Sequence, residues 1–121
     1  MNPINWFEIP VTDMARAKKF YEHILDIEIS LHDFDKLLMG WFPFNHEAPG
    51  ATGSLVQGKD YIPSHHGSMV YFIVKEIDNV LPKITSVGGK IINPKFEIGD
   101  HGFVAHFEDS EGNRIALHQG K

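Results

Sequence analysis

Apolar and polar positions alternate over residues 6–11, and a helical stripe of apolar positions follows them. Alternation with a period of two is typical of a strand that is covered on one side only. Thr12 or Asp13 then offers a side-chain oxygen that can cap a helix, and apolar residues recur at helical spacing from Met14 to Leu25. The opening of the chain therefore predicts a strand, a tight turn and an amphipathic helix.

The same pattern returns in the second half of the chain. Residues 69–74 form an apolar strand, a helical stripe covers residues 77–84, and Gly88-Gly89 supplies a helix stop. Without gaps, the two copies superpose Trp6 on Met69, Val11 on Val74 and Asp13 on Glu76. The chain therefore contains two degenerate copies of one pattern.

Short strands are expected after each helix. They cover residues 27–34, 36–44 and 51–57 in the first copy, and residues 90–93, 102–108 and 113–119 in the second. The sequence thus predicts a single α+β domain of two βαβββ repeats, residues 1–58 and 68–121, joined by a linker over residues 59–67. We expect four-stranded antiparallel units with a helix on one face, which curl into a mixed sheet around a cavity.

Composition narrows the classes of function. The 121 residues suit one domain, and the absence of cysteine excludes disulfides, thiolate metal sites and a cysteine nucleophile. The formal charge is -5, and the lysines and arginines are scattered, so we expect no nucleic-acid partner. No apolar run approaches a membrane span, and the N-terminus does not resemble a signal peptide. We therefore expect a cytoplasmic protein that does not bind membranes.

Three motifs resemble the vicinal oxygen chelate superfamily, which includes glyoxalase I, bleomycin-resistance proteins and extradiol dioxygenases. They are residues 7–13 with Arg16-Ala17 and Phe20-Tyr21, residues 70–74 with Gly88-Gly89-Lys90, and residues 107–117, which begin Phe-Glu-Asp-Ser-Glu-Gly-Asn. The resemblance covers essentially the whole chain. It implies the two-repeat fold already expected and a small-molecule cavity on the free faces of the strands.

Metal-dependent members of this superfamily place His and Glu ligands on those free faces. Residue-by-residue carry-over puts Trp6, Met69 and Ala116 at ligand positions, with a fourth position at Gly53 or Ser54. Indole, thioether and methyl groups offer no oxygen or nitrogen ligand for a divalent metal. The resemblance therefore implies a member without the usual metal, and we expect no cofactor.

Polar candidates for chemistry remain on the same strands. Glu8 shares the parity of Trp6 and could act as a general base or anchor a ligand. His118 shares the parity of Ala116, and His106 joins it if the hairpin register pairs His106 with Ala116. Glu8, His106 and His118 are thus candidate catalytic residues, and the alternative is that the histidines are ordinary cavity-wall residues.

An apolar lining is expected at matching positions of the two repeats. Trp6, Met69 and Tyr71 could stack on an aromatic or amphiphilic ligand, although core packing would produce a similar pattern. With Ser54 and Ala116 they make up the predicted ligand-binding set.

Three functions follow from these residues. The first is a protein, similar to bleomycin-resistance proteins, that binds a small organic molecule without a metal. The second is a lyase, isomerase or dioxygenase that uses Glu8 and nearby histidines, with or without a displaced metal. The third is a protein whose pocket is filled by its own side chains and that acts through oligomer contacts. The resemblance further implies a homodimer.

Overall fold

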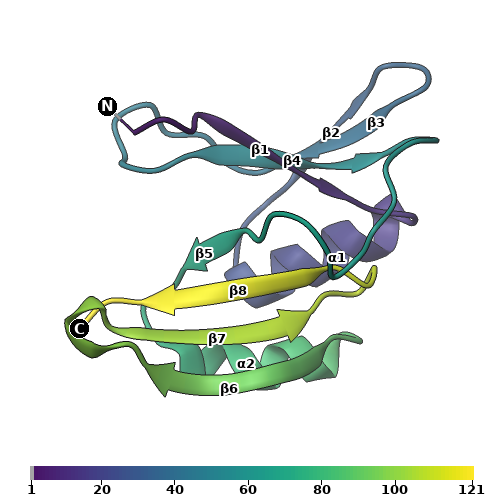
Figure 1. The fold of residues 1–121 in the computed structure, drawn as a ribbon. Coiled ribbons are helices and arrows are strands. Elements are labelled where there is room, and N and C mark those ends of the chain that lie inside the picture. Colours follow the sequence, from purple (N-terminus) through teal and green to yellow (C-terminus); the bar gives the residue numbers. More distant parts are fainter. Residues whose placement is uncertain (1) are drawn as a thin grey trace.

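The computed structural model describes residues 2–121 as two similar modules (Figure 1). The first module contains β1 (Trp6–Pro10), α1 (Met14–Leu25), β2 (Ser30–Asp33), β3 (Leu38–Trp41) and β4 (Thr52–Gln57). The second contains β5 (Tyr71–Ile73), α2 (Ile77–Ser86), β6 (Lys90–Glu97), a short 3-10 helix η1 (Gly99–His101), β7 (Phe103–Glu108) and β8 (Arg114–Gln119). Each module thus has the predicted order of one strand, one helix and three strands.

Each module forms its own four-stranded sheet, and the two sheets have equivalent strand orders. The orders are β1-β4-β3-β2 and β5-β8-β7-β6. β1 runs parallel to β4 and β5 runs parallel to β8, whereas the remaining pairs are antiparallel. The α+β fold of two βαβββ modules with mixed sheets is confirmed. Within the expected antiparallel units, the pairing of the first and last strands differs: it is parallel, because the helix and two strands between them bring the last strand back in the direction of the first.

Matching hydrogen bonds confirm the superposition of the two copies at Val11 and Val74. The amide of Val11 donates to the carbonyl of Val56, and the amide of Val74 donates to the carbonyl of His118, both at 2.9 Å. Asp13 and Glu76 are the N-cap residues of α1 and α2. Since Val56 corresponds to His118, the residue that corresponds to Ala116 is Ser54.

The last strand of each module ends in a glutamine, and this glutamine binds the start of the helix in the same module. The Gln57 side chain accepts a hydrogen bond from the amide of Met14, and the Gln119 side chain accepts one from the amide of Ile77, both at 2.8 Å. The first amides of a helix have no acceptor within the helix, so a side-chain oxygen stabilises them. The two modules therefore begin their helices by the same long-range contact.

The helices lie on one face of the sheets, and their apolar sides build a shared core. α1 packs against β3, β4 and α2, whereas α2 packs against β6, β7 and β8. Tyr21 and Phe20 of α1 are almost fully buried, and the ring of Phe20 lies 6.1 Å from that of Phe107 in β7. Phe7 of β1 contacts Phe72 of β5 with ring centroids 5.7 Å apart. Aromatic packing therefore joins the two modules through their first strands.

The turn over residues 109–113, between β7 and β8, binds the start of α1. A single oxygen of Glu111 accepts hydrogen bonds from the amides of Thr12 and Asp13 at 2.9 Å. Arg16 donates to the other oxygen of Glu111 at 2.7 Å, and the Glu111 side chain has no solvent exposure. This carboxylate therefore supplies acceptors for the helix start of the other module.

Two more residues of the 109–113 turn strengthen the same junction. The buried Tyr21 hydroxyl donates to Asp109 at 2.6 Å. Asn113 donates to the carbonyl of Pro10 at 2.8 Å and to Asp109 at 3.0 Å. The side chains of the turn therefore bind both the turn itself and the first module. We call the contacts of Asp109, Glu111 and Asn113 the clasp.

Some strand boundaries differ from the predicted ones. β5 begins at Tyr71, so Met69 precedes the strand. β3 ends at Trp41 instead of residue 44, and Pro43 in that stretch has no amide to donate to a neighbouring strand. β6 extends to Glu97, beyond the expected residue 93, through two register shifts against β7. Among residues 2–121, no helix is long and apolar enough to cross a membrane.

Replacing the clasp carboxylate should destabilise the protein at neutral pH. Glu111→Gln should lower the free energy of unfolding by about 2 kcal/mol at pH 7, because it removes charged acceptors from a buried position. Burial opposes ionisation of Glu111, but the hydrogen bonds from Arg16, Asp13 and Thr12 outweigh it and lower its pKa to about 2. Urea unfolding monitored by circular dichroism measures the difference.

The sign of the pH dependence follows from this lowered pKa. A carboxylate with a lowered pKa in the folded state stabilises the protein above its ordinary pKa, and the contribution is lost as the pH falls. The difference between wild type and Glu111→Gln should therefore be complete above pH 4.5 and shrink as the pH approaches about 2. Glu28→Gln, at an exposed carboxylate, is the matched control. A difference that stayed constant over this range would contradict the assignment.

Candidate functional site

The face of each sheet opposite the helices, here called the open face, carries the predicted site residues. On the first sheet, Trp6 pairs with Thr52, Glu8 pairs with Ser54, and Ser54 also pairs with Trp41. Directly paired residues of neighbouring strands point to the same side of a sheet. Trp6, Glu8, Ser54 and Trp41 therefore share the open face of the first sheet.

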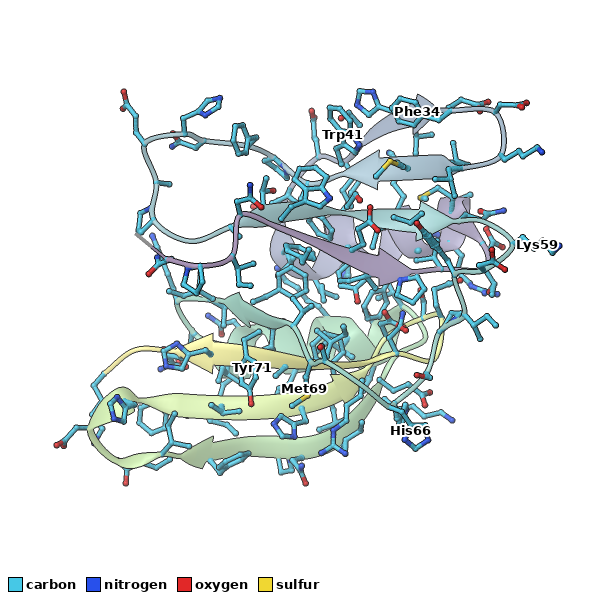
Figure 2. The ribbon with its side chains drawn as sticks, turned by 45° about the horizontal axis from the view of Figure 1, so that its top comes forward. Phe34, Trp41, Lys59, His66, Met69 and Tyr71 are labelled. Carbon is cyan, nitrogen blue, oxygen red and sulfur yellow. The ribbon has the colours of Figure 1, made fainter. Side chains whose placement is uncertain are left out.

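Aromatic rings run across this open face from β1 to the end of β2. Trp6 contacts Trp41 edge to face with ring centroids 6.0 Å apart. The His32 ring stacks on Trp41 with centroids 3.7 Å apart, and the Phe34 ring stacks with His32 at 6.4 Å. Figure 2 shows Trp41 and Phe34 close together over this sheet. The row presents flat, polarisable surfaces suited to planar ligands.

A groove opens at the end of this aromatic row. Its volume is about 990 Å³, and it lies between the N-terminal segment, β1 and the loop of residues 43–51. Its lining includes Ile4, Trp6, Trp41, Phe44, His46 and Pro49. Phe44 and His46 meet edge to face with ring centroids 4.1 Å apart. An apolar groove with one imidazole among its rings can hold a small aromatic molecule.

Two polar atoms beside the groove have no partner. Ser54 is fully buried, and its Oγ makes no hydrogen bond within the described residues 2–121. The indole nitrogen of Trp41 is likewise buried without an acceptor in that part of the chain. An unpaired buried polar group costs about 1–3 kcal/mol. The Ser54 hydroxyl and the Trp41 indole nitrogen therefore lower the stability of the fold and do not contribute to it.

On the second sheet, the register brings three predicted residues into one row. Tyr71 of β5 pairs with Ala116 of β8, and Ala116 pairs with His106 of β7. The conditional expectation that His106 aligns with Ala116 is confirmed. The Tyr71 and His106 rings are 6.4 Å apart, and Tyr71 extends over β8 in Figure 2. Phe96 approaches the other edge of His106 at 5.9 Å.

His106 has a defined tautomer in its free neutral form. Arg114 donates from Nη2 to His106 Nδ1 at 2.9 Å, and Asn93 lies 3.1 Å from the same nitrogen. A guanidinium can only donate, so Nδ1 accepts and the proton of the neutral ring is on Nε2. Burial and, to a lesser extent, the positive charge of Arg114 lower the pKa of His106. The ring therefore stays neutral to lower pH than an ordinary histidine.

The three predicted catalytic residues do not form one hydrogen-bonded group. His118 Nε2 lies 2.7 Å from the carbonyl of His101, an acceptor to which the ring can only donate. Within the described part of the chain, no hydrogen bond or ion pair joins Glu8 to His106 or His118. The catalytic roles of Glu8, His106 and His118 remain predictions.

The side chains at the positions carried over from metal-dependent members of the superfamily do not form a metal site. Trp6, Ser54, Met69 and Ala116 occupy the ligand positions, and Ala116 is fully buried. Across residues 2–121, no three His, Asp or Glu side chains gather closely enough to hold a metal ion. A divalent cation needs three or four converging donors, so this donor set does not fit one.

Sequence reasoning missed several residues of the open faces. Trp41 lay inside a predicted strand, but its face depended on a register that the sequence could not define. Arg114 shares the parity of Ala116, a signal that could have placed it on the open face. The groove loop, residues 43–51, has no periodic pattern that would reveal its shape.

This chain is similar to known proteins in both sequence and structure. One is "Putative glyoxylase CFP32" of Mycobacterium tuberculosis, 27% identical over 130 residues, which cover 95% of this chain but only 44% of that protein. A glyoxylase/bleomycin resistance protein/dioxygenase domain from Frankia sp. EAN1pec has a TM-score of 0.77 at 15% identity, covering 100% of this chain and 99% of that one. FosX, a fosfomycin resistance protein from Listeria monocytogenes, has a TM-score of 0.71 at 17% identity, covering 100% and 92%.

These structural similarities, at low sequence identity, establish the fold alone. The family follows from a sequence match over nearly the whole chain, residues 3–117. With its two βαβββ modules and open sheet faces, this chain belongs to the Glyoxalase/Bleomycin resistance protein/Dioxygenase superfamily.

Proposed function

We propose that the protein binds a small aromatic or amphiphilic molecule in the groove between Trp6, Trp41 and the loop of residues 43–51, without a divalent metal. The observation that carries the proposal is the groove itself, about 990 Å³ in volume and lined by four aromatic side chains and His46. Ligand sites in proteins commonly have this size and a mainly apolar lining. Sequestration of a small molecule needs no other machinery.

The exposure of the lining side chains supports binding over a packing role. Phe44 is 59% exposed and Trp6 is 38% exposed, although both carry large apolar rings. Contiguous exposed apolar surface on a small protein is often functional. A ligand that covered these rings would recover the free energy that their exposure forfeits.

Removing one ring of the groove should weaken ligand binding without unfolding the protein. Both tryptophans of the chain, Trp6 and Trp41, line the groove, so tryptophan emission reports directly on its occupant. The probe is 8-anilinonaphthalene-1-sulfonate, followed by a panel of aromatic metabolites and antibiotics that compete with it. Phe44→Ala should weaken binding about tenfold, since it removes a stacking surface.

Phe34→Ala is the matched control. Phe34 is similarly exposed and belongs to the same aromatic row, but it does not line the groove. Its replacement should change the affinity by less than about twofold. Unquenched tryptophan emission with every member of the panel, or equal losses in both variants, would sink the proposed function.

We also propose that two copies of the chain associate as a homodimer. This chain spans less than half of the Mycobacterium tuberculosis relative, which is therefore long enough to carry a second unit of this size. Ile73, on the open face of the second sheet, is 80% exposed, and Ile62 is 75% exposed. A second copy would cover apolar surface of this kind.

Sedimentation velocity tests the association. The wild-type chain should sediment as a dimer at micromolar concentration, and Ile73→Asp should shift it towards the monomer by placing a charge in the contact. Lys59→Gln, at an exposed linker position, changes the net charge by the same amount and is the control. A wild-type protein that stayed monomeric at all concentrations would contradict the proposal.

A further inference from the structure

We propose that Arg114 and His106 form a second binding site, on the open face of the second sheet, for an organic carboxylate whose apolar part lies against Tyr71 and Phe96. The site is separate from the groove of the first sheet and does not depend on it. It is assembled from β5, β6, β7 and β8. The register places Tyr71 and His106 in one row across Ala116, with Arg114 in the row to one side and Phe96 in the row to the other.

The first step in the argument is that Arg114 has no counter-ion. Across residues 2–121, no carboxylate forms an ion pair with it. Glu108 lies directly opposite Arg114 in the β7–β8 ladder. Its carboxylate instead contacts His65 at 2.8 Å and Lys90 at 3.9 Å. The nearest natural partner of the guanidinium is therefore engaged elsewhere.

The second step is that Arg114 has more N–H donors than there are acceptor atoms around it. A guanidinium carries five N–H groups in a planar fork. The only side-chain acceptor that Arg114 finds in the described chain is His106 Nδ1, and its Nε is buried without any partner. Leaving donors of a charged group unpaired is costly, and an anion at the remaining N–H groups of the guanidinium would reduce that cost. A planar carboxylate matches the fork with two parallel hydrogen bonds.

The third step concerns the other side of the His106 ring. Because Nδ1 accepts from Arg114, the Nε2 nitrogen carries the proton and can donate. Among residues 2–121, no acceptor binds this nitrogen. Arg114 and His106 thus present two kinds of donor, one charged and one neutral, on opposite sides of the imidazole ring.

The rings beside His106 define the rest of the ligand. Tyr71 is 52% exposed and Phe96 is 42% exposed, and both approach His106 with their ring planes nearly perpendicular to it. These surfaces favour an anion that carries an aromatic or aliphatic body over a bare inorganic anion. An aromatic carboxylate has both an anion for the donors and a ring for the apolar surface of the site.

Histidine-selective NMR gives a direct test, with benzoate as the probe. The His106 signals are identified by their loss in His106→Gln. Benzoate should shift the His106 ring nitrogens in a saturable way, and benzamide, which has the same ring without the charge, should bind about tenfold more weakly. Inorganic phosphate should also bind more weakly than benzoate, because it has no body to rest on the rings.

The variants separate this site from other causes. Arg114→Gln should weaken benzoate binding about tenfold, and Arg114→Lys should also weaken it because the ammonium lacks the planar fork. Lys19→Gln removes one exposed positive charge from α1 and should leave the affinity unchanged. Phe44→Ala, which damages the groove, should not change the His106 shift. If Arg114→Gln does not fold, Arg114→Lys carries the comparison.

Four results would contradict the inference. Wild-type protein with no saturable His106 shift would show that the site does not bind the probe. Equal affinities for benzoate and benzamide would show an apolar contact without anion recognition. Equal benzoate affinities in wild type and in both Arg114 variants would remove Arg114 from the site. Phosphate binding as tight as benzoate would exclude the role of Tyr71 and Phe96.

Discussion

The carboxylate of Glu111 holds the two modules in a fixed relation. It lies in the second module, yet it accepts hydrogen bonds from the backbone of Thr12 and Asp13 and from the side chain of Arg16 in the first. Within its own turn the Asp13 side chain accepts from the amide of Arg16, but the amides of Thr12 and Asp13 are bound by Glu111. Because α1 is anchored in this way, both open faces, and the sites that we place on them, keep their orientation relative to the same helix.

The fold could be predicted because its information is local and repeated. Alternation, cap residues and apolar stripes identified both strand-helix units, and the hydrogen bonds of Val11 and Val74 confirm their alignment. Gln57, Gln119 and Glu111 could not be assigned in the same way. Each binds a helix start that is distant in sequence, and a polar side chain near a strand end looks the same whether it meets solvent or a buried amide.

The candidate sites were only partly predicted, because some of their contacts also join segments that are distant in sequence. Strand parity placed Trp6 and Glu8 on one face, and the condition on His106 and Ala116 was met by the β7–β8 register. The neighbours of these residues depend on the register between strands that are distant in sequence. A change of one residue in that register would move every side chain of the strand to the other face of the sheet. Trp41 was missed for this reason, whereas Arg114 could have been placed by its parity with Ala116 in the same strand.

The groove loop contrasts with the clasp in how it is held. The recorded hydrogen bonds of residues 43–51 are made within the loop or to Thr52 at its end. In Figure 1 this loop and the clasp lie at opposite ends of the molecule. The contacts that define the fold are thus separated from the residues that would choose a ligand. Substitutions, insertions and deletions in the loop can accumulate during evolution at little cost in stability, so related chains can change their ligand while keeping the same scaffold.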